Sequence, residues 1–119
     1  GIVPDMGGMV LLPKLVRSDV LRRLTYTAEP VEAEQAERWG LITEIAEDPL
    51  AAATDLATTI AGKSPAAIRA AKRLIAIAET EDAPTVLDAE SRLQSDLIGK
   101  PEQMEVIAAQ FGKRAAVFK

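Results

Sequence analysis

The sequence lacks two residue types altogether, since none of its 119 residues is cysteine or histidine. Without cysteine the chain has no disulfide and no thiol nucleophile, and without histidine it has no imidazole base. Zinc sites of the cysteine–histidine type and catalysis by serine–histidine or cysteine–histidine pairs are therefore excluded within this chain. We expect no metal site, and the absence of cysteine is compatible with a reducing, cytoplasmic location.

Aromatic residues are scarce, at 3% of the chain. A core must therefore be built from aliphatic side chains, and alanine and leucine dominate these. Both residues favour helices over strands. With 48% hydrophobic and 27% charged residues, the chain has the composition of one folded domain rather than of a disordered segment.

An excess of positive charge and long apolar runs are also missing. The net charge is −4, whereas a nucleic-acid-binding surface needs a basic face. No apolar run approaches the roughly 18 to 20 residues that span a bilayer, and no signal-peptide pattern opens the chain. We therefore expect neither nucleic acid nor a membrane as a partner.

The chain does contain a series of helix start and stop signals, in which a capping residue precedes proline or a helix ends at glycine. They predict six or seven helices and one short strand. The predicted helices cover about Met9–Val16, Val20–Tyr26, Glu32–Trp39, Pro49–Ala61, a stretch opened by Ser64–Pro65, Asp82 to near Gly99, and a last one opened by Lys100–Pro101. Leu41–Ile45 predicts the strand. A single strand needs a partner, either Gly1–Val3 or sequence outside this chain, and we favour the latter.

Apolar residues repeat every three or four positions along the later helices, which predicts one buried face on each. Two of these stripes are Ile68, Ala71, Leu74, Ile75 and Ala78, and Met104, Ile107, Ala108 and Phe111. Because the second stripe lies on a short helix near the chain end, we expect it to contact another subunit.

Four short blocks of sequence stand in a fixed order along the chain. They are Gly1–Gly8 with Leu12–Val16, Pro30–Ala33 with Ala36–Ile42, Lys63–Pro65 with Ala70–Leu74, and Lys113–Arg114 with Val117–Lys119. The ordered set resembles the enoyl-CoA hydratase/isomerase (crotonase) family. The resemblance implies the C-terminal half of an α/β crotonase-like (ClpP/crotonase) fold, mostly α within this chain. Residues 1–16 would be the end of the spiral core with its following helix, and residues 17–119 a helical trimerisation region.

The resemblance also implies a function. Family members hold the thioester carbonyl of an acyl-CoA between two backbone N–H groups, which stabilise the enolate formed when a proton moves at the neighbouring carbon. We therefore expect hydration or double-bond isomerisation of an enoyl-CoA in fatty acid metabolism, with no cofactor because coenzyme A is part of the substrate. Family members assemble as homotrimers, often paired into hexamers (dimers of trimers). The alternative that remains open is a catalytically inactive helical oligomerisation module.

Within this chain the resemblance implies Asp5 as the catalytic residue, because related isomerases have an acidic residue at this position. The family's other catalytic groups would lie upstream of Gly1, so we expect the chain alone to be inactive and poorly stable. A carboxylate can move the proton if it lies within hydrogen-bond reach and has a suitable pKa. The other interpretation is that Asp5 caps the following helix, and the two roles compete because a capped carboxylate has a lowered pKa.

Four further residues are candidates for substrate binding. Gly7 and Gly8 would either let the thioester or acyl chain approach the backbone closely or serve close helix packing. Met9 corresponds to a family position that faces the acyl pocket or the core. Lys113 matches a family lysine that reaches the nucleotide of coenzyme A, although Gly112 replaces an acidic residue of the family's pattern. The other interpretation of Lys113 is a solvated cation favoured by the helix dipole.

Overall fold

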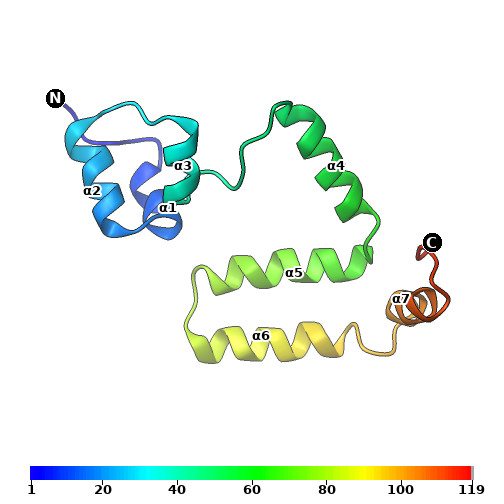
Figure 1. Ribbon diagram of the computed structural model, residues 1–119. Coiled ribbons are helices and arrows are strands. Elements are labelled where there is room, and N and C mark those ends of the chain that lie inside the picture. Colours follow the sequence, from blue (N-terminus) through cyan, green and yellow to red (C-terminus); the bar gives the residue numbers. More distant parts are fainter. Residues whose placement is uncertain (119) are drawn as a thin grey trace. The chain divides into compact units, whose positions relative to one another are not determined.

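The computed structural model describes residues 1–118, and all regular structure within them is helical (Figure 1). This described part forms seven α-helices. They are α1 (Gly8–Leu15), α2 (Ser18–Thr27), α3 (Ala33–Trp39), α4 (Pro49–Ala61), α5 (Pro65–Ala78), α6 (Ala83–Ser95) and α7 (Pro101–Phe111). The mostly helical fold class expected from the sequence is therefore confirmed. Lys119, the last residue of the fourth family block, lies outside the described residues.

The strand predicted at Leu41–Ile45 is wrong, because no strand forms anywhere between residues 1 and 118 and this segment is irregular. The Leu41 N–H instead donates to the Ala36 carbonyl oxygen at 2.9 Å, as part of the turn that ends α3. Ile42 and Ile45 remain 40% and 46% exposed. The apolar residues alone do not make a strand here, since no neighbouring strand in the described part supplies hydrogen-bond partners for its backbone.

The chain divides into two compact units, Gly1–Pro49 and Leu50–Lys119. The first unit holds α1, α2 and α3, and the second holds α5, α6, α7 and almost all of α4. Of the predicted site residues, Asp5, Gly7, Gly8 and Met9 belong to the first unit and Lys113 to the second. No helix within residues 1–118 is both long enough and apolar enough to cross a membrane.

The first unit packs three short helices around small apolar side chains, with Val16, Val20 and Ala36 buried. Helix α3 ends at Gly40, as its sequence predicts, and the φ of Gly40 is a left-handed 81°. A Cβ atom at Gly40 would lie 3.3 Å from the Leu15 carbonyl oxygen. Glycine at this position therefore allows both the left-handed turn of the backbone and the close approach of the ends of α3 and α1.

In the second unit α5 and α6 lie side by side (Figure 1). Both begin with side-chain caps at the residues that the sequence indicates. Ser64 Oγ accepts a hydrogen bond from the Ala67 N–H at 3.1 Å, and Asp82 Oδ1 accepts one from the Thr85 N–H at 3.1 Å. These bonds satisfy backbone donors that the first turn of a helix leaves without partners.

The apolar stripes predicted to be buried are exposed within this chain. Ile75 is 59% exposed, Met104 53% and Phe111 86%. Among the described residues of the second unit, the buried apolar side chain is that of Ala109. Three-and-four spacing identifies the apolar face of a helix, but it does not identify what covers that face. Contact of the last stripe with another subunit stays a prediction.

Candidate functional site

The turn before α1 brings together four of the five predicted site residues, namely Asp5, Gly7, Gly8 and Met9. The Gly8 N–H donates to the Asp5 carbonyl oxygen at 2.9 Å, which closes a tight turn directly before the helix. These residues lie close together because they are neighbours in the sequence, but the sequence alone does not predict their backbone conformations.

Asp5 does not cap α1, so the capping interpretation of this residue is wrong. The N-cap is Gly7, and no side chain within residues 1–118 caps this helix. The Asp5 side chain is exposed, and its carboxylate accepts no hydrogen bond from the described residues. The capping role that competed with proton transfer at Asp5 is therefore removed.

Two successive residues of this turn have left-handed backbone: the φ of Met6 is 54° and that of Gly7 is 83°. Glycine adopts this conformation freely, whereas other residues adopt it at a cost of about 1 kcal/mol. A Cβ atom at Gly7 would meet nothing within 4 Å, and one at Gly8 would lie at an ordinary 4.0 Å from Pro4 and Leu12. Close packing therefore does not explain Gly7, which is explained by its backbone conformation.

Among the described residues, one backbone donor in the first turn of α1 has no acceptor. The Gly8 N–H donates to Asp5, and the N–H groups of Val10 and Leu11 donate to the Gly7 carbonyl oxygen. The Met9 N–H has no acceptor within residues 1–118, and the Met9 side chain is 47% exposed. The segment thus offers an exposed carboxylate, a free N–H donor and an apolar side chain within five consecutive residues. Enolate chemistry needs an anionic proton acceptor, and Asp5 is the residue of this segment that can supply one.

Lys113 follows α7 and also has left-handed backbone, with a φ of 48°. Its N–H donates to the Gln110 carbonyl oxygen at 3.2 Å. The Lys113 side chain is exposed and has no acidic partner within residues 1–118, whereas its neighbour Arg114 forms an ion pair with Glu105. Of these two adjacent cations, Lys113 is therefore the one whose charge no residue of the described part compensates.

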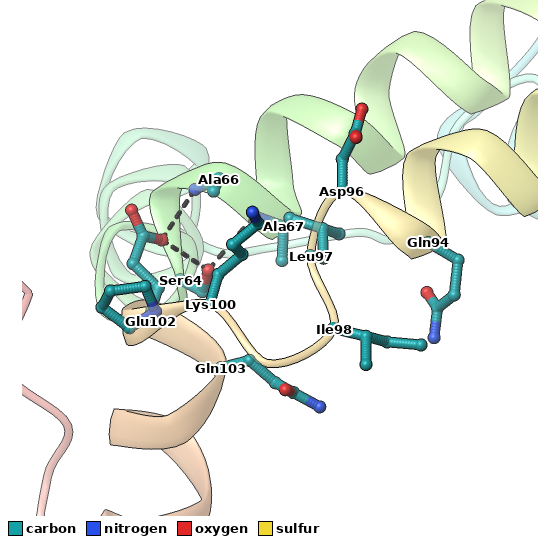
Figure 2. A pocket seen from close by; sticks show the side chains of 11 residues that line it. Ser64, Ala66, Ala67, Gln94, Asp96, Leu97, Ile98, Lys100, Glu102 and Gln103 are labelled. Carbon is teal, nitrogen blue, oxygen red and sulfur yellow. Dashed lines mark hydrogen bonds between the residues drawn. The ribbon is translucent and has the colours of Figure 1, made fainter.

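The structure also contains a cavity that the sequence does not reveal, with a volume of about 440 Å³ (Figure 2). Its lining comes from the start of α5, the end of α6, the following loop and the start of α7: Ser64, Ala66, Ala67, Gln94, Asp96, Leu97, Ile98, Lys100, Pro101, Glu102 and Gln103. Figure 2 shows Glu102 reaching the first turn of α5. Its Oε2 atom accepts hydrogen bonds from Ser64 Oγ at 2.6 Å and from the Ala66 N–H at 2.9 Å.

These hydrogen bonds determine the chemistry of Glu102. The Ser64 hydroxyl, and after it the Ala66 N–H, lower the pKa of the Glu102 carboxyl. The ionised carboxylate then acts as an acceptor at the N-terminus of α5, where negative charge is favoured. Because it is engaged in this way, Glu102 has a structural role and is a poor general base. The Ser64–Pro65 signal identifies the cap, but no local pattern links it to a glutamate 38 residues later.

Sequence comparison relates the whole chain to known proteins. The profile of the enoyl-CoA hydratase/isomerase family matches residues 1–119. A carnitinyl-CoA dehydratase of Citrobacter koseri is 34% identical over 76 residues, which make up 62% of this chain and 29% of that protein. This chain is therefore much shorter than its relative.

Comparison with solved structures also finds similarity to enoyl-CoA hydratases. An enoyl-CoA hydratase of Bacillus anthracis superposes with a TM-score of 0.91 at 29% identity, over 100% of this chain and 47% of that one. DspI of Pseudomonas aeruginosa superposes with a TM-score of 0.89 at 33% identity, and the match covers 100% of this chain and 46% of the DspI chain. The chain spans about half the length of these solved relatives and matches the helical C-terminal half of their crotonase fold. It belongs to the enoyl-CoA hydratase/isomerase family.

Proposed function

We propose that this chain is the helical half of an enzyme that acts on acyl-CoA thioesters and hydrates an enoyl-CoA or moves its double bond. Family membership over residues 1–119 supports a coenzyme A thioester as the substrate class. The observation within the chain that carries the proposal is the exposed Asp5 carboxylate, which no described residue caps or pairs with, beside the free N–H of Met9.

In this proposal Asp5 carries the proton that moves near the thioester. Backbone N–H donors hold the thioester carbonyl oxygen and stabilise the negative charge of the enolate. Gly7 and Gly8 leave space for the acyl chain beside the backbone, and Met9 offers it an apolar contact. Lys113 contacts the anionic nucleotide of coenzyme A. No separate cofactor is needed because coenzyme A is part of the substrate.

The proposal includes assembly into homotrimers, or hexamers made from two trimers, in the cytoplasm. Its support is the exposed stripe on α7, which needs a partner surface if it is to be buried. The alternative of a catalytically inactive oligomerisation module is less well supported. Such a module would need the apolar faces but not an exposed carboxylate held beside left-handed glycine backbone.

The test is the substitution Asp5→Asn in the complete enzyme that contains this chain. Asparagine has nearly the same shape but cannot accept the proton, so the rate of enoyl-CoA turnover is expected to fall by roughly 10² to 10⁴-fold. The melting temperature is expected to stay the same, because the carboxylate makes no hydrogen bond within residues 1–118. Turnover of crotonyl-CoA and of an isomerisable enoyl-CoA should both be measured.

A matched control is Asp55→Asn, which changes an exposed carboxylate on α4. This variant is expected to keep both turnover and melting temperature. If Asp5→Asn retains full hydratase and isomerase activity, Asp5 does not move the proton and its assigned role is wrong. A complete enzyme that turns over no enoyl-CoA at all would contradict the proposed function itself.

A further inference from the structure

The segment after α7 is held back against the helix by one carboxylate, that of Glu105. Arg114 Nη2 donates to Glu105 Oε2 at 3.0 Å, and Arg114 Nη1 donates to Glu105 Oε1. The Val117 N–H donates to the same Oε1 atom at 2.8 Å. One side chain of the helix therefore holds residues 9 and 12 positions further along the chain. A two-pronged pairing of arginine with carboxylate fixes orientation as well as distance.

The backbone between α7 and these two contacts makes a sharp turn. The Gly112 N–H donates to the Ala108 carbonyl oxygen at 2.9 Å, and the Arg114 N–H donates to that of Ala109 at 3.0 Å. Lys113 stands between them with its φ of 48°. A residue other than glycine keeps this conformation only when its surroundings hold it there. The Glu105 contacts with Arg114 and Val117 are side-chain restraints of that kind.

The electrostatics keep the Glu105 carboxyl ionised at ordinary pH. Hydrogen bonds from Arg114, and after them the one from the Val117 N–H, lower the pKa of the Glu105 carboxyl to about 2. The carboxylate is therefore ionised whenever the enzyme works. The pairing also compensates the charge of Arg114, and it leaves Lys113 as the neighbouring cation with no acidic partner in the described part.

We propose that Glu105 is the positioning residue for Lys113, holding the chain on its C-terminal side so that the Lys113 ammonium meets the phosphates of the coenzyme A nucleotide. The inference rests on the proposed function, which assigns this contact to Lys113. Glu105 itself does not touch the substrate. Its role is to keep the turn that carries Lys113 in one conformation and to keep Arg114 from competing for the same phosphates.

The test is Glu105→Gln in the complete enzyme, measured with an acyl-CoA and with the matching acyl-pantetheine thioester, which lacks the nucleotide. The KM for the acyl-CoA is expected to rise roughly three- to tenfold, because a positioned contact to a phosphate is weakened. The KM for the acyl-pantetheine and both kcat values are expected to stay unchanged. Hydrogen exchange of the Val117 amide is expected to become faster, which reports the loss of the Glu105 contact directly.

The matched control is Glu90→Gln, which removes an exposed glutamate of α6 and is expected to change none of these quantities. The second variant, Lys113→Ala, tests the contact on which the inference rests. If Lys113→Ala raises the KM for acyl-CoA alone but Glu105→Gln does not, the positioning role is wrong and the proposed contact stands. If neither variant raises the KM for acyl-CoA more than the KM for acyl-pantetheine, the proposed contact of Lys113 with coenzyme A is wrong. The positioning role is then overturned as well. An equal rise of KM for both substrates in Glu105→Gln would also overturn it, since general destabilisation would then explain the effect.

Discussion

The two units of the chain are held together in different ways. In Gly1–Pro49 the order comes from left-handed backbone turns and small buried side chains, and the Arg17–Asp19 ion pair joins residues only two positions apart. In Leu50–Lys119 two glutamates of α7 make side-chain hydrogen bonds to residues far along the chain. Glu102 reaches back 38 residues to Ser64, and Glu105 reaches forward 12 residues to Val117. Among the described residues, the side-chain hydrogen bonds of the first unit therefore join residues near one another in the sequence, whereas these two glutamates reach distant ones.

Because of this difference, we expect different substitutions to destabilise the two units. A left-handed glycine cannot be replaced without strain, whatever the rest of the molecule does. A carboxylate that accepts hydrogen bonds from another helix loses its effect when its partner is removed or when it is protonated. We therefore expect backbone substitutions to affect the first unit most, and removal of partners or protons to affect the second.

The largest effect on stability is expected from Gly40→Ala in the first unit. Its φ of 81° is unfavourable for alanine, and the new Cβ atom would lie 3.3 Å from the Leu15 carbonyl oxygen. The two costs together are expected to lower the free energy of unfolding by about 2 kcal/mol. Urea denaturation of the complete protein, followed by far-UV circular dichroism, measures this change.

The control for this prediction is Gly7→Ala, because Gly7 has nearly the same φ of 83° but open space around its Cβ position. Only the backbone cost applies there, so the loss is expected to be about 1 kcal/mol. Equal losses in the two variants would show that the close approach of α3 to α1 does not contribute. A larger loss at Gly7 would contradict the account of both turns.

The next effect is expected from Ser64→Ala in the second unit. The substitution removes the side-chain cap of α5 and the hydroxyl that donates to Glu102. Loss of such a cap lowers the free energy of unfolding by about 1 kcal/mol. The hydrogen exchange of the Ala67 amide, which Ser64 caps, is expected to become faster.

Ser91→Ala is the matched control, because the Ser91 hydroxyl bonds only to the Leu87 carbonyl oxygen of its own helix among the described residues. Alanine is a better helix former than serine, so this variant is expected to be neutral or slightly stabilised. If the two serine variants have the same stability, the polar connection between α5 and α7 does not contribute to folding.

These expectations also mark how far the sequence alone could predict this fold. Helix ends are local signals, and the caps at Ser64 and Asp82 and the stop at Gly40 are all confirmed by the structure. The four neighbouring site candidates at the start of α1 could be predicted, because the family's motifs follow one another in the same order along this chain. The free carboxylate of Asp5 could not, because Asp5 stands in a position that is equally suited to a cap.

The errors have a common physical cause, which is that they concern partners rather than local conformation. Leu41–Ile45 contains apolar residues suited to a strand, but a strand forms only beside another one. The stripe on α5 has the correct spacing, but Ile75 on it is 59% exposed, because spacing does not place a surface against it. Glu102 and Glu105 look like ordinary helix carboxylates in the sequence, because their partners are far away along the chain.

The smallest effect is expected from acid, which protonates the two glutamates that make the distant connections of the second unit. The pKa of Glu105 is lowered from an ordinary 4.5 to about 2, and that of Glu102 is lowered as well. A carboxyl whose folded pKa is below its unfolded value stabilises the fold above the unfolded pKa and loses this contribution as the pH falls through the folded pKa. The contribution of Glu105 is therefore complete above about pH 4.5 and is lost on the way down to about pH 2.

Amide chemical shifts measured from pH 6 down to about pH 1 in the complete, nitrogen-15-labelled protein can follow this loss. The Val117 amide is expected to titrate with a midpoint near pH 2, since its acceptor is the Glu105 carboxylate. The Leu41 amide of the first unit donates to a backbone carbonyl, which has no proton to gain, so it is expected to stay constant. Asp19 also has a lowered pKa because of Arg17, but this pair lies within one turn of chain and its protonation releases no separate segment. A Val117 amide that titrates near pH 4.5 instead would show that Arg114 does not hold Glu105 in its ionised form, and the connection between α7 and the following segment would then be no stronger than an ordinary surface contact.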